Sequence, residues 1–183
     1  MNITILNGNP DAANIKFDDY LCRLASLLRF SEHEVAVFNL RDMDIKQCIG
    51  CFSCWVKTPG KCILNDDSPT IYRAYLKSDL VLFSSPVIMG YISALLKKMT
   101  EKLLPLIHPY VEFKQKEVHH QARYDKSPLL ALLLETGEGV DMEDIDIISD
   151  IYKRTAINAL TILSFVRLTS EPIEALVNEI NRI

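Results

Sequence analysis

The sequence has no excess of positive charge and no long apolar run. Its 183 residues carry a formal net charge of −4, and its lysines and arginines are scattered singly or in pairs such as Lys97 and Lys98. Such a chain offers no basic surface to neutralise phosphates, so we expect no nucleic-acid partner. No apolar segment approaches the roughly 18 residues needed to span a bilayer, so we expect no membrane partner.

Internal repeats, low-complexity stretches and a secretory leader are also missing. Met1 leads directly into an apolar segment, without the basic, apolar and small-residue parts of a signal peptide, which predicts a cytoplasmic protein. Apolar residues make up 49% and charged residues 24% of the chain, which is typical of folded globular proteins. The length fits one unit, so we predict a single domain over residues 1–183.

Short apolar runs alternate with amphipathic segments of helical period along most of the chain. The runs predict strands at residues 2–7, 34–39, 79–84, 129–134 and 165–169. Five strands separated by helices predict an α/β fold, a doubly wound parallel sheet in the order 2-1-3-4-5 with helices on both faces. Ligands of such sheets bind at the carboxyl ends of the strands, so the loops there are the candidate sites.

The segment from Pro105 to Pro128 loses this pattern. A stretch of that length without regular structure is typical of a lid, an interface or a mobile loop. It holds His119 and His120, which as neighbours point to opposite sides of a helix or strand. We therefore expect these histidines at the surface and not as metal ligands.

Four of the five cysteines lie within fifteen residues, which is not the spread of a disulfide framework. The first three of these cysteines are separated from one another by two residues, and seven residues separate the third from the fourth. This spacing can direct their thiolates to the corners of an iron–sulfur cube. We therefore predict a metal site, a [4Fe-4S] cluster, on Cys48, Cys51, Cys54 and Cys62. Two alternatives are buried cysteines that only pack a compact loop, and a redox-active or regulatory thiol pair.

A second candidate site follows the third apolar run, at residues 84–93. There a buried strand ends in small residues and runs into a helix, which exposes backbone donors beside an apolar lip and suits a flat heteroaromatic ring. The alternative is an ordinary strand-to-helix turn capped by Ser93.

Three segments carry a family resemblance: residues 5–10, the cysteine loop 48–67 with Trp55 and Asp66, and residues 85–97. They resemble the NADPH-dependent FMN reductase family, and the cysteine spacing is similar to that of its iron–sulfur flavoproteins. The resemblance covers roughly the first 105 residues. It implies a flavodoxin-like fold and a flavoprotein oxidoreductase that moves electrons from NAD(P)H or a redox protein partner through FMN to an acceptor, and we expect a homo-oligomer.

The resemblance also implies which residues bind the cofactor, although it identifies no catalytic residue. The phosphate would lie by the first loop, the flavin ring by the loop after the third strand, and the far edge of the ring by the loop after the fourth. The corresponding residues are Asn9 and Asn14, then Pro86, Val87, Ile88, Met89, Gly90 and Tyr91, and then Glu135, Thr136 and Gly137.

The first loop departs from the family pattern at Asp11. Its carboxylate opposes the field that a helix N-terminus offers to a phosphate, so we expect FMN to bind more weakly than in relatives. Two other functions stay open: an electron carrier that uses the cysteine loop without a substrate of its own, and a flavin-free interaction protein.

Overall fold

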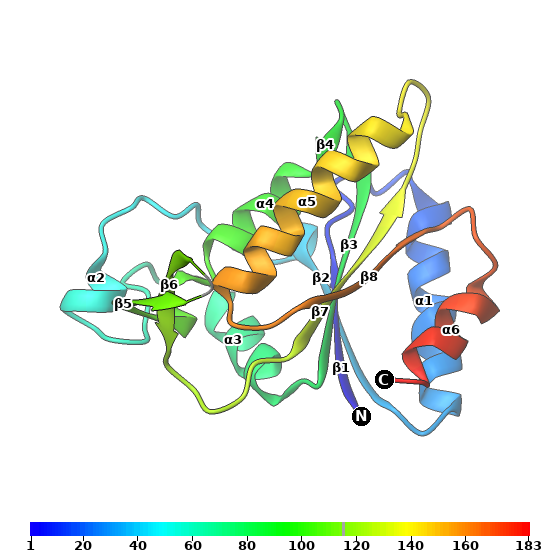
Figure 1. The fold of residues 1–183 in the computed structure, drawn as a ribbon. Coiled ribbons are helices and arrows are strands. Elements are labelled where there is room, and N and C mark those ends of the chain that lie inside the picture. Colours follow the sequence, from blue (N-terminus) through cyan, green and yellow to red (C-terminus); the bar gives the residue numbers. More distant parts are fainter. Residues whose placement is uncertain (115) are drawn as a thin grey trace.

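The computed structural model describes residues 1–114 and 116–183, and a parallel sheet with helices on both faces forms its centre (Figure 1). The main sheet has the order β2-β1-β3-β7-β8 with all these strands parallel, and β4 adds an antiparallel pairing to β3. The predicted α/β fold and its order are therefore confirmed. The strands are β1 Asn2–Asn7, β2 Glu34–Asn39, β3 Leu80–Ile88, β4 Tyr91–Ile92, β5 Ile107–Lys114, β6 Glu117–Ala122, β7 Leu129–Glu135 and β8 Leu163–Leu168.

Two apolar clusters divide the helices between the faces of the sheet. Helices α1 and α6 pack on one face, and α3, α4 and α5 pack on the other. The helices are α1 Ile15–Phe30, α2 Ser53–Val56, α3 Ser68–Lys77, α4 Ala94–Glu101, α5 Met142–Asn158 and α6 Ile173–Ile180, with 3-10 turns η1 Leu40–Asp42 and η2 Leu104–Leu106.

The central strand β3 shows why the third run is apolar throughout. Leu80 and Leu82 face the cluster of α1 and α6, while Val81 and Phe83 face the other cluster, and all four are completely buried. A strand covered on both faces needs apolar side chains in both directions.

This strand is longer than predicted. It continues through Ile88 and turns back on itself as β4, so residues 86–88 form a strand end where the sequence predicts a loop. Met89 and Gly90 both have positive φ, 53° and 75°, which is the backbone of a two-residue type I′ hairpin turn. The sequence hides this turn because Met89 replaces the Asn or Asp that usually precedes the glycine.

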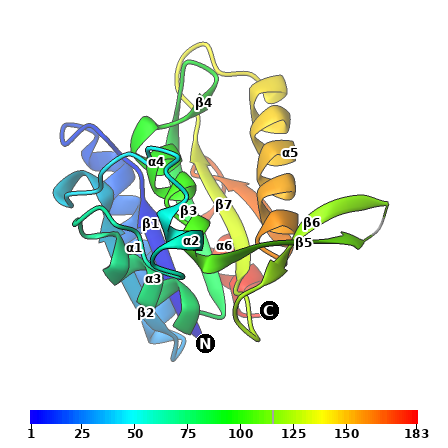
Figure 2. The ribbon, with the colours of Figure 1, turned by 90° about the vertical axis from the view of Figure 1, so that its left-hand side faces the viewer.

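The segment 105–128 contains a regular hairpin, β5 and β6, that extends past the C-terminal half of α5 (Figure 2). The prediction of no regular structure was wrong there. It missed the hairpin because apolar and polar residues do not alternate cleanly along the two strands. The expectation of surface histidines was also wrong for His119, which is 4% exposed. Among the described residues, no helix has the length and apolar character that crossing a membrane requires.

The first loop lies in close contact with the start of α4. The Gly8 amide donates to the Ser84 carbonyl at 2.8 Å, and the Ser93 hydroxyl donates to the Gly8 carbonyl. A Cβ atom on Gly8 would lie 2.7 Å from the Leu96 Cβ, closer than such atoms approach. Glycine is therefore required here to let the loop approach the helix.

We predict that Gly8→Ala lowers the free energy of unfolding by about 1–3 kcal/mol, since the added methyl group must displace backbone or the Leu96 side chain. Urea titration followed by circular dichroism measures the change. Gly137→Ala is the control, because nothing lies within 4 Å of a Cβ at that position. Equal stability of the two variants would contradict the close-packing argument.

Candidate functional site

Strand register brings the three predicted cofactor loops to one edge of the sheet. Asn7 at the end of β1 pairs with Ser84, and Pro86 near the end of β3 pairs with Glu135 at the end of β7. The Asn14 amide donates to the Glu135 carboxylate at 2.5 Å, so two of the predicted binding residues touch across 121 positions of sequence. The first and fourth loops are thus held together at the carboxyl edge.

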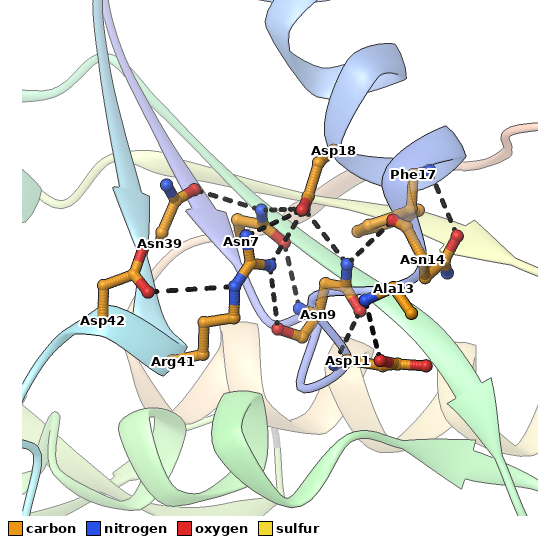
Figure 3. Close-up of polar contacts among 10 residues, drawn as sticks. All are labelled: Asn7, Asn9, Asp11, Ala13, Asn14, Phe17, Asp18, Asn39, Arg41 and Asp42. Atoms are coloured by element: carbon orange, nitrogen blue, oxygen red, sulfur yellow. Dashed lines mark hydrogen bonds and ion pairs between the residues drawn. The ribbon is translucent and has the colours of Figure 1, made fainter.

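A polar network of side chains holds the first loop (Figure 3). The Asn9 side chain is buried, its amide group donates to Asp18 at 3.1 Å, and its backbone amide donates to the Asn7 side chain at 2.9 Å. Asp18 also pairs with Arg41 at 2.7 Å. Sequence reasoning missed Asp18 and Arg41. Only their positions could have indicated a role, because Asp18 lies in the first turn of α1 and Arg41 lies just after β2.

The charge of Asp18 is balanced within this network by Arg41. Burial would raise the pKa of Asp18, but hydrogen bonds from Arg41, Asn7 and Asn9 hold it below its usual value. The hydrogen bond to Asp18 in turn raises the pKa of Arg41, and Asp42 lies 3.8 Å from the same guanidinium group. Arg41 is therefore committed to carboxylates and is not a free cation for a phosphate.

Asp11 occupies the position where the loop could bind an anion. Its carboxylate accepts a hydrogen bond from the Ala13 amide at 2.8 Å, and the Asp11 amide donates to the Asn9 side chain at 3.1 Å. Backbone N–H groups before a helix are the groups that bind phosphates in such loops. The Asp11 carboxylate thus takes a donor that a phosphate oxygen would use.

The hairpin tip after β3 forms an apolar lip at the same edge. Met89 is fully exposed and Ile88 is 42% exposed, while Tyr91 is partly buried. The tip leans on α5, because a Cβ on Gly90 would lie 2.7 Å from the Asp144 carboxylate. The tip therefore presents exposed apolar side chains at the edge where the loops meet.

The four clustered cysteines line one small pocket together with Lys102. The loop that carries them bends at Gly50 and Phe52, whose φ values are 64° and 53°, and Phe52 starts the short helix α2. In the described part of the chain, no three histidine, cysteine or acidic side chains are arranged to hold a single metal ion. All four cysteines nevertheless line the same pocket, as residues that share one cluster would.

The thiols are also close enough to influence one another. Burial raises the pKa of Cys54, and the negative charges that Cys62, Cys48 and Cys51 would carry raise it further. All five cysteines are free thiols. The predicted ligands are therefore gathered in one place, with Cys54 at the buried end.

A buried ion pair supports this pocket. The Lys102 ammonium lies 2.7 Å from Asp66 and donates to the Cys62 sulfur at 3.2 Å, and both charged side chains are almost fully buried. Burial would lower the pKa of Lys102, but hydrogen bonds to Asp66 and Cys62 raise it, so the lysine stays charged. Sequence reasoning missed Lys102, which follows an ordinary amphipathic helix.

Trp55 connects the cysteine loop to the β5–β6 hairpin. Its indole N–H donates to the carbonyls of Leu104 and Ile107 at 3.1 and 3.0 Å. Its ring stacks on Phe52 and packs against His120 at a centroid distance of 5.1 Å. The hairpin therefore forms part of the wall that holds the cysteine loop.

Helix α4 separates the two candidate sites. Ser93 at its start contacts the first loop, and Lys102 just after its end contacts Cys62, which at 1.5 Å per residue places the two about 13 Å apart. The sequence predicts the cysteines close to the carboxyl edge of the sheet. Cys62 lies instead beside the far end of α4, where Lys102 donates to its sulfur, and the other three cysteines line the same pocket.

Comparison with known families gives one match that covers most of the chain. The family model described as NADPH-dependent FMN reductase matches residues 1–121.

Among curated proteins, an iron–sulfur flavoprotein of Archaeoglobus fulgidus is 26% identical over 102 residues, which cover 56% of this chain and 48% of the relative. An iron–sulfur flavoprotein of Clostridioides difficile is 33% identical over 105 residues, which cover 56% of this chain and 45% of the relative. The chain thus spans about half the length of these relatives.

Solved structures share the fold at low identity. A putative quinone reductase from Klebsiella pneumoniae has a TM-score of 0.68 at 12% identity, covering 100% of this chain and 83% of its own. An FMN-dependent NADH-azoreductase from Bacillus anthracis, solved with FMN, has a TM-score of 0.56 at 17% identity, covering 100% and 95%. Similarity at this level of identity describes the fold.

We predict that Asp66→Asn destabilises the protein by about 3 kcal/mol, because it leaves the Lys102 charge buried without its partner. Adding Lys102→Met should restore most of the loss. Glu101→Gln is the control, since it breaks the exposed pair with Lys97 and should cost no more than about 0.5 kcal/mol. Chemical denaturation at neutral pH measures all three, and a cost for Asp66→Asn as small as the control would contradict the buried pair.

Proposed function

Because the chain belongs to the NADPH-dependent FMN reductase family, we propose that it is an FMN-dependent oxidoreductase of the iron–sulfur flavoprotein type. It would take electrons from NAD(P)H or a redox protein and pass them to an acceptor. One observation carries the proposal: three loops and an exposed apolar hairpin tip converge at the carboxyl edge, and α4 leads from there to a pocket of four cysteines.

FMN, when bound, supplies the hydride and electron chemistry. The residues suited to its ring are Ile88, Met89 and Tyr91 at the hairpin tip, with Thr136 and Gly137 exposed on the neighbouring loop. These side chains would cover an apolar ring and exclude water from one side of it. The phosphate end fits less well, because Asp11 holds the Ala13 amide.

The cysteine pocket supports a resident iron–sulfur cluster. Cys48, Cys51, Cys54 and Cys62 would supply four thiolates, and the Lys102 ammonium would offset part of their negative charge. A group of free thiols of this kind fits a reducing compartment, which supports a cytoplasmic protein.

Exposed apolar side chains around the cysteine loop and the hairpin support an association surface, which a second copy of the chain or a redox protein would cover. Examples are Ile49, Val56 and Phe113, each more than half exposed.

The direct test is anaerobic purification followed by reconstitution with iron, sulfide and FMN. The proposal expects bound flavin with a two-band visible spectrum, iron with a broad brown absorption, and NAD(P)H oxidation that depends on FMN. Iron without flavin would favour the electron carrier. Protein that stays colourless with both additions would contradict the proposal and favour an interaction protein.

We predict that Asp11→Ser tightens FMN binding about fivefold. The substitution removes the repulsion between the Asp11 carboxylate and a bound phosphate dianion, which is about 1 kcal/mol for such charges roughly 8 Å apart in a water-like medium. It also replaces the charged acceptor of the Ala13 amide by a weaker one, a hydroxyl. Calorimetric titration with FMN measures the change. Riboflavin, which lacks the phosphate, should bind both proteins equally, and Asp19→Ser should leave FMN affinity unchanged. A tighter complex with riboflavin as well would show that the charge argument is wrong.

We predict that replacing any one of the four clustered cysteines by serine greatly reduces iron content after anaerobic reconstitution, because a cluster lacking one thiolate is much less stable. Cys22→Ser is the matched control, since Cys22 is exposed on α1, far from the pocket. Iron content and visible absorption are measured for each variant. Four variants that keep the iron of the unaltered protein would leave the cysteines as packing residues or a thiol pair.

A further inference from the structure

A cavity with a largely apolar lining lies apart from the predicted flavin loops. It has a volume of about 460 Å³ and is enclosed by the ends of α3 and α5, the end of α4 and the β5–β6 hairpin. It opens beside Leu130, at the amino end of β7, whereas the flavin loops follow the carboxyl ends of the strands. None of its lining residues belongs to those loops. This volume is ordinary for a site that binds a small molecule.

The floor of the cavity is apolar. Its lining includes six leucines and Ile107, together with hairpin residues Val111 and Val118, which are both more than half exposed. Such a surface favours a flat apolar body that displaces water from it.

Two side-chain nitrogens in the cavity wall lack hydrogen-bond partners. Arg123 Nε and His120 Nδ1 are both buried, and neither has a hydrogen-bond partner among the described residues. A second nitrogen of Arg123, Nη2, donates to the Ile107 carbonyl at 3.3 Å, which fixes the guanidinium group in the wall. A buried donor left unpaired costs about 1–3 kcal/mol. The Arg123 and His120 side chains both line the cavity, so an acceptor on a ligand would lie beside two polar groups that are not fully paired.

The charge of the wall favours an anion. No ion pair to Arg123 is found in the described part of the chain, while the one lysine of the lining, Lys126, is paired with Asp79. Glu101 is the only acidic residue of the lining, and Lys97 lies 3.1 Å from its carboxylate. A carboxylate on the ligand would therefore meet one lining cation without an ion-pair partner, Arg123, and the one acidic side chain of the lining is already paired.

From these observations we propose that this cavity, which we call the hairpin cavity, binds a small aromatic carboxylate. The ring lies on the apolar floor between α5 and the hairpin, and the carboxylate accepts hydrogen bonds from Arg123 and His120. The site is independent of the proposed flavin chemistry, because it shares no residue with the flavin loops. It adjoins the cysteine pocket, since Glu101 and Leu104 line both.

The test uses 1-naphthoate as the probe and calorimetry on the full chain without added flavin or iron. The proposal expects sub-millimolar binding, with the neutral analogue 1-naphthylmethanol at least about tenfold weaker. Arg123→Gln should weaken naphthoate at least tenfold and leave the alcohol unchanged. Arg73→Gln, which removes an exposed arginine on α3, should bind naphthoate like the unaltered protein.

The single tryptophan locates the ligand. Trp55 packs against His120 in the cavity wall, so naphthoate should shift the indole N–H resonance of Trp55 in a nuclear magnetic resonance spectrum. Ala159→Trp, which places a large side chain in the cavity, should abolish both the shift and the heat. This variant decides the matter if Arg123→Gln proves unfolded by circular dichroism.

The proposal is overturned if naphthoate does not bind, if the alcohol binds as tightly as the acid, or if folded Arg123→Gln keeps full affinity. Binding that survives in Ala159→Trp would place the ligand elsewhere and overturn it too. Because the experiment needs no flavin, a failure of the proposed oxidoreductase function would not change any of these results.

Discussion

A charged ammonium group buried inside a protein must be paired, and this requirement organises the half of the molecule that carries the cysteines. Lys102 follows α4 and contacts both Asp66 and Cys62, so one side chain joins the helix to the loop before α3 and to the last clustered cysteine. Asp66 also accepts hydrogen bonds from the Lys46 amide and from Ser68. The loop therefore begins and ends on the same carboxylate, which closes it around the pocket.

The two ends of α4 solve different problems of packing. At its start, the absence of a side chain on Gly8 lets the first loop approach the helix, and Ser93 joins the two. At its end, Lys102 carries a charge into the interior. Helix α4 thus fixes the spacing between the carboxyl edge and the cysteine pocket. A polar side chain holds each of its ends, Ser93 at the first loop and Lys102 at the cysteine pocket.

Much of the sheet could be predicted because its signal is local. The run Leu80–Phe83 is apolar in every position, which only a strand covered on both faces requires, and the strand order follows from the helical crossovers. The hairpin β5–β6 was missed because its side chains carry no alternation to mark a buried face.

The parts of the site that sequence reasoning missed depend on contacts between distant positions. The cysteines could be found from their spacing, but Lys102 lies 40 positions from the sulfur it contacts, and Arg41 lies 23 from Asp18. No local pattern encodes such a pair. The same holds for the extended β3, where Met89 occupies a turn position that sequence rules give to Asn or Asp.

Trp55 has a consequence for the order of folding. Its indole group bonds to carbonyls 49 and 52 positions later in the chain, beyond α3, β3 and α4. Closing a loop of that length costs entropy that only the finished sheet and helices repay. We therefore expect the cysteine loop to acquire its shape late, after β3 has joined the sheet, and a peptide covering residues 48–62 alone not to gather its four cysteines.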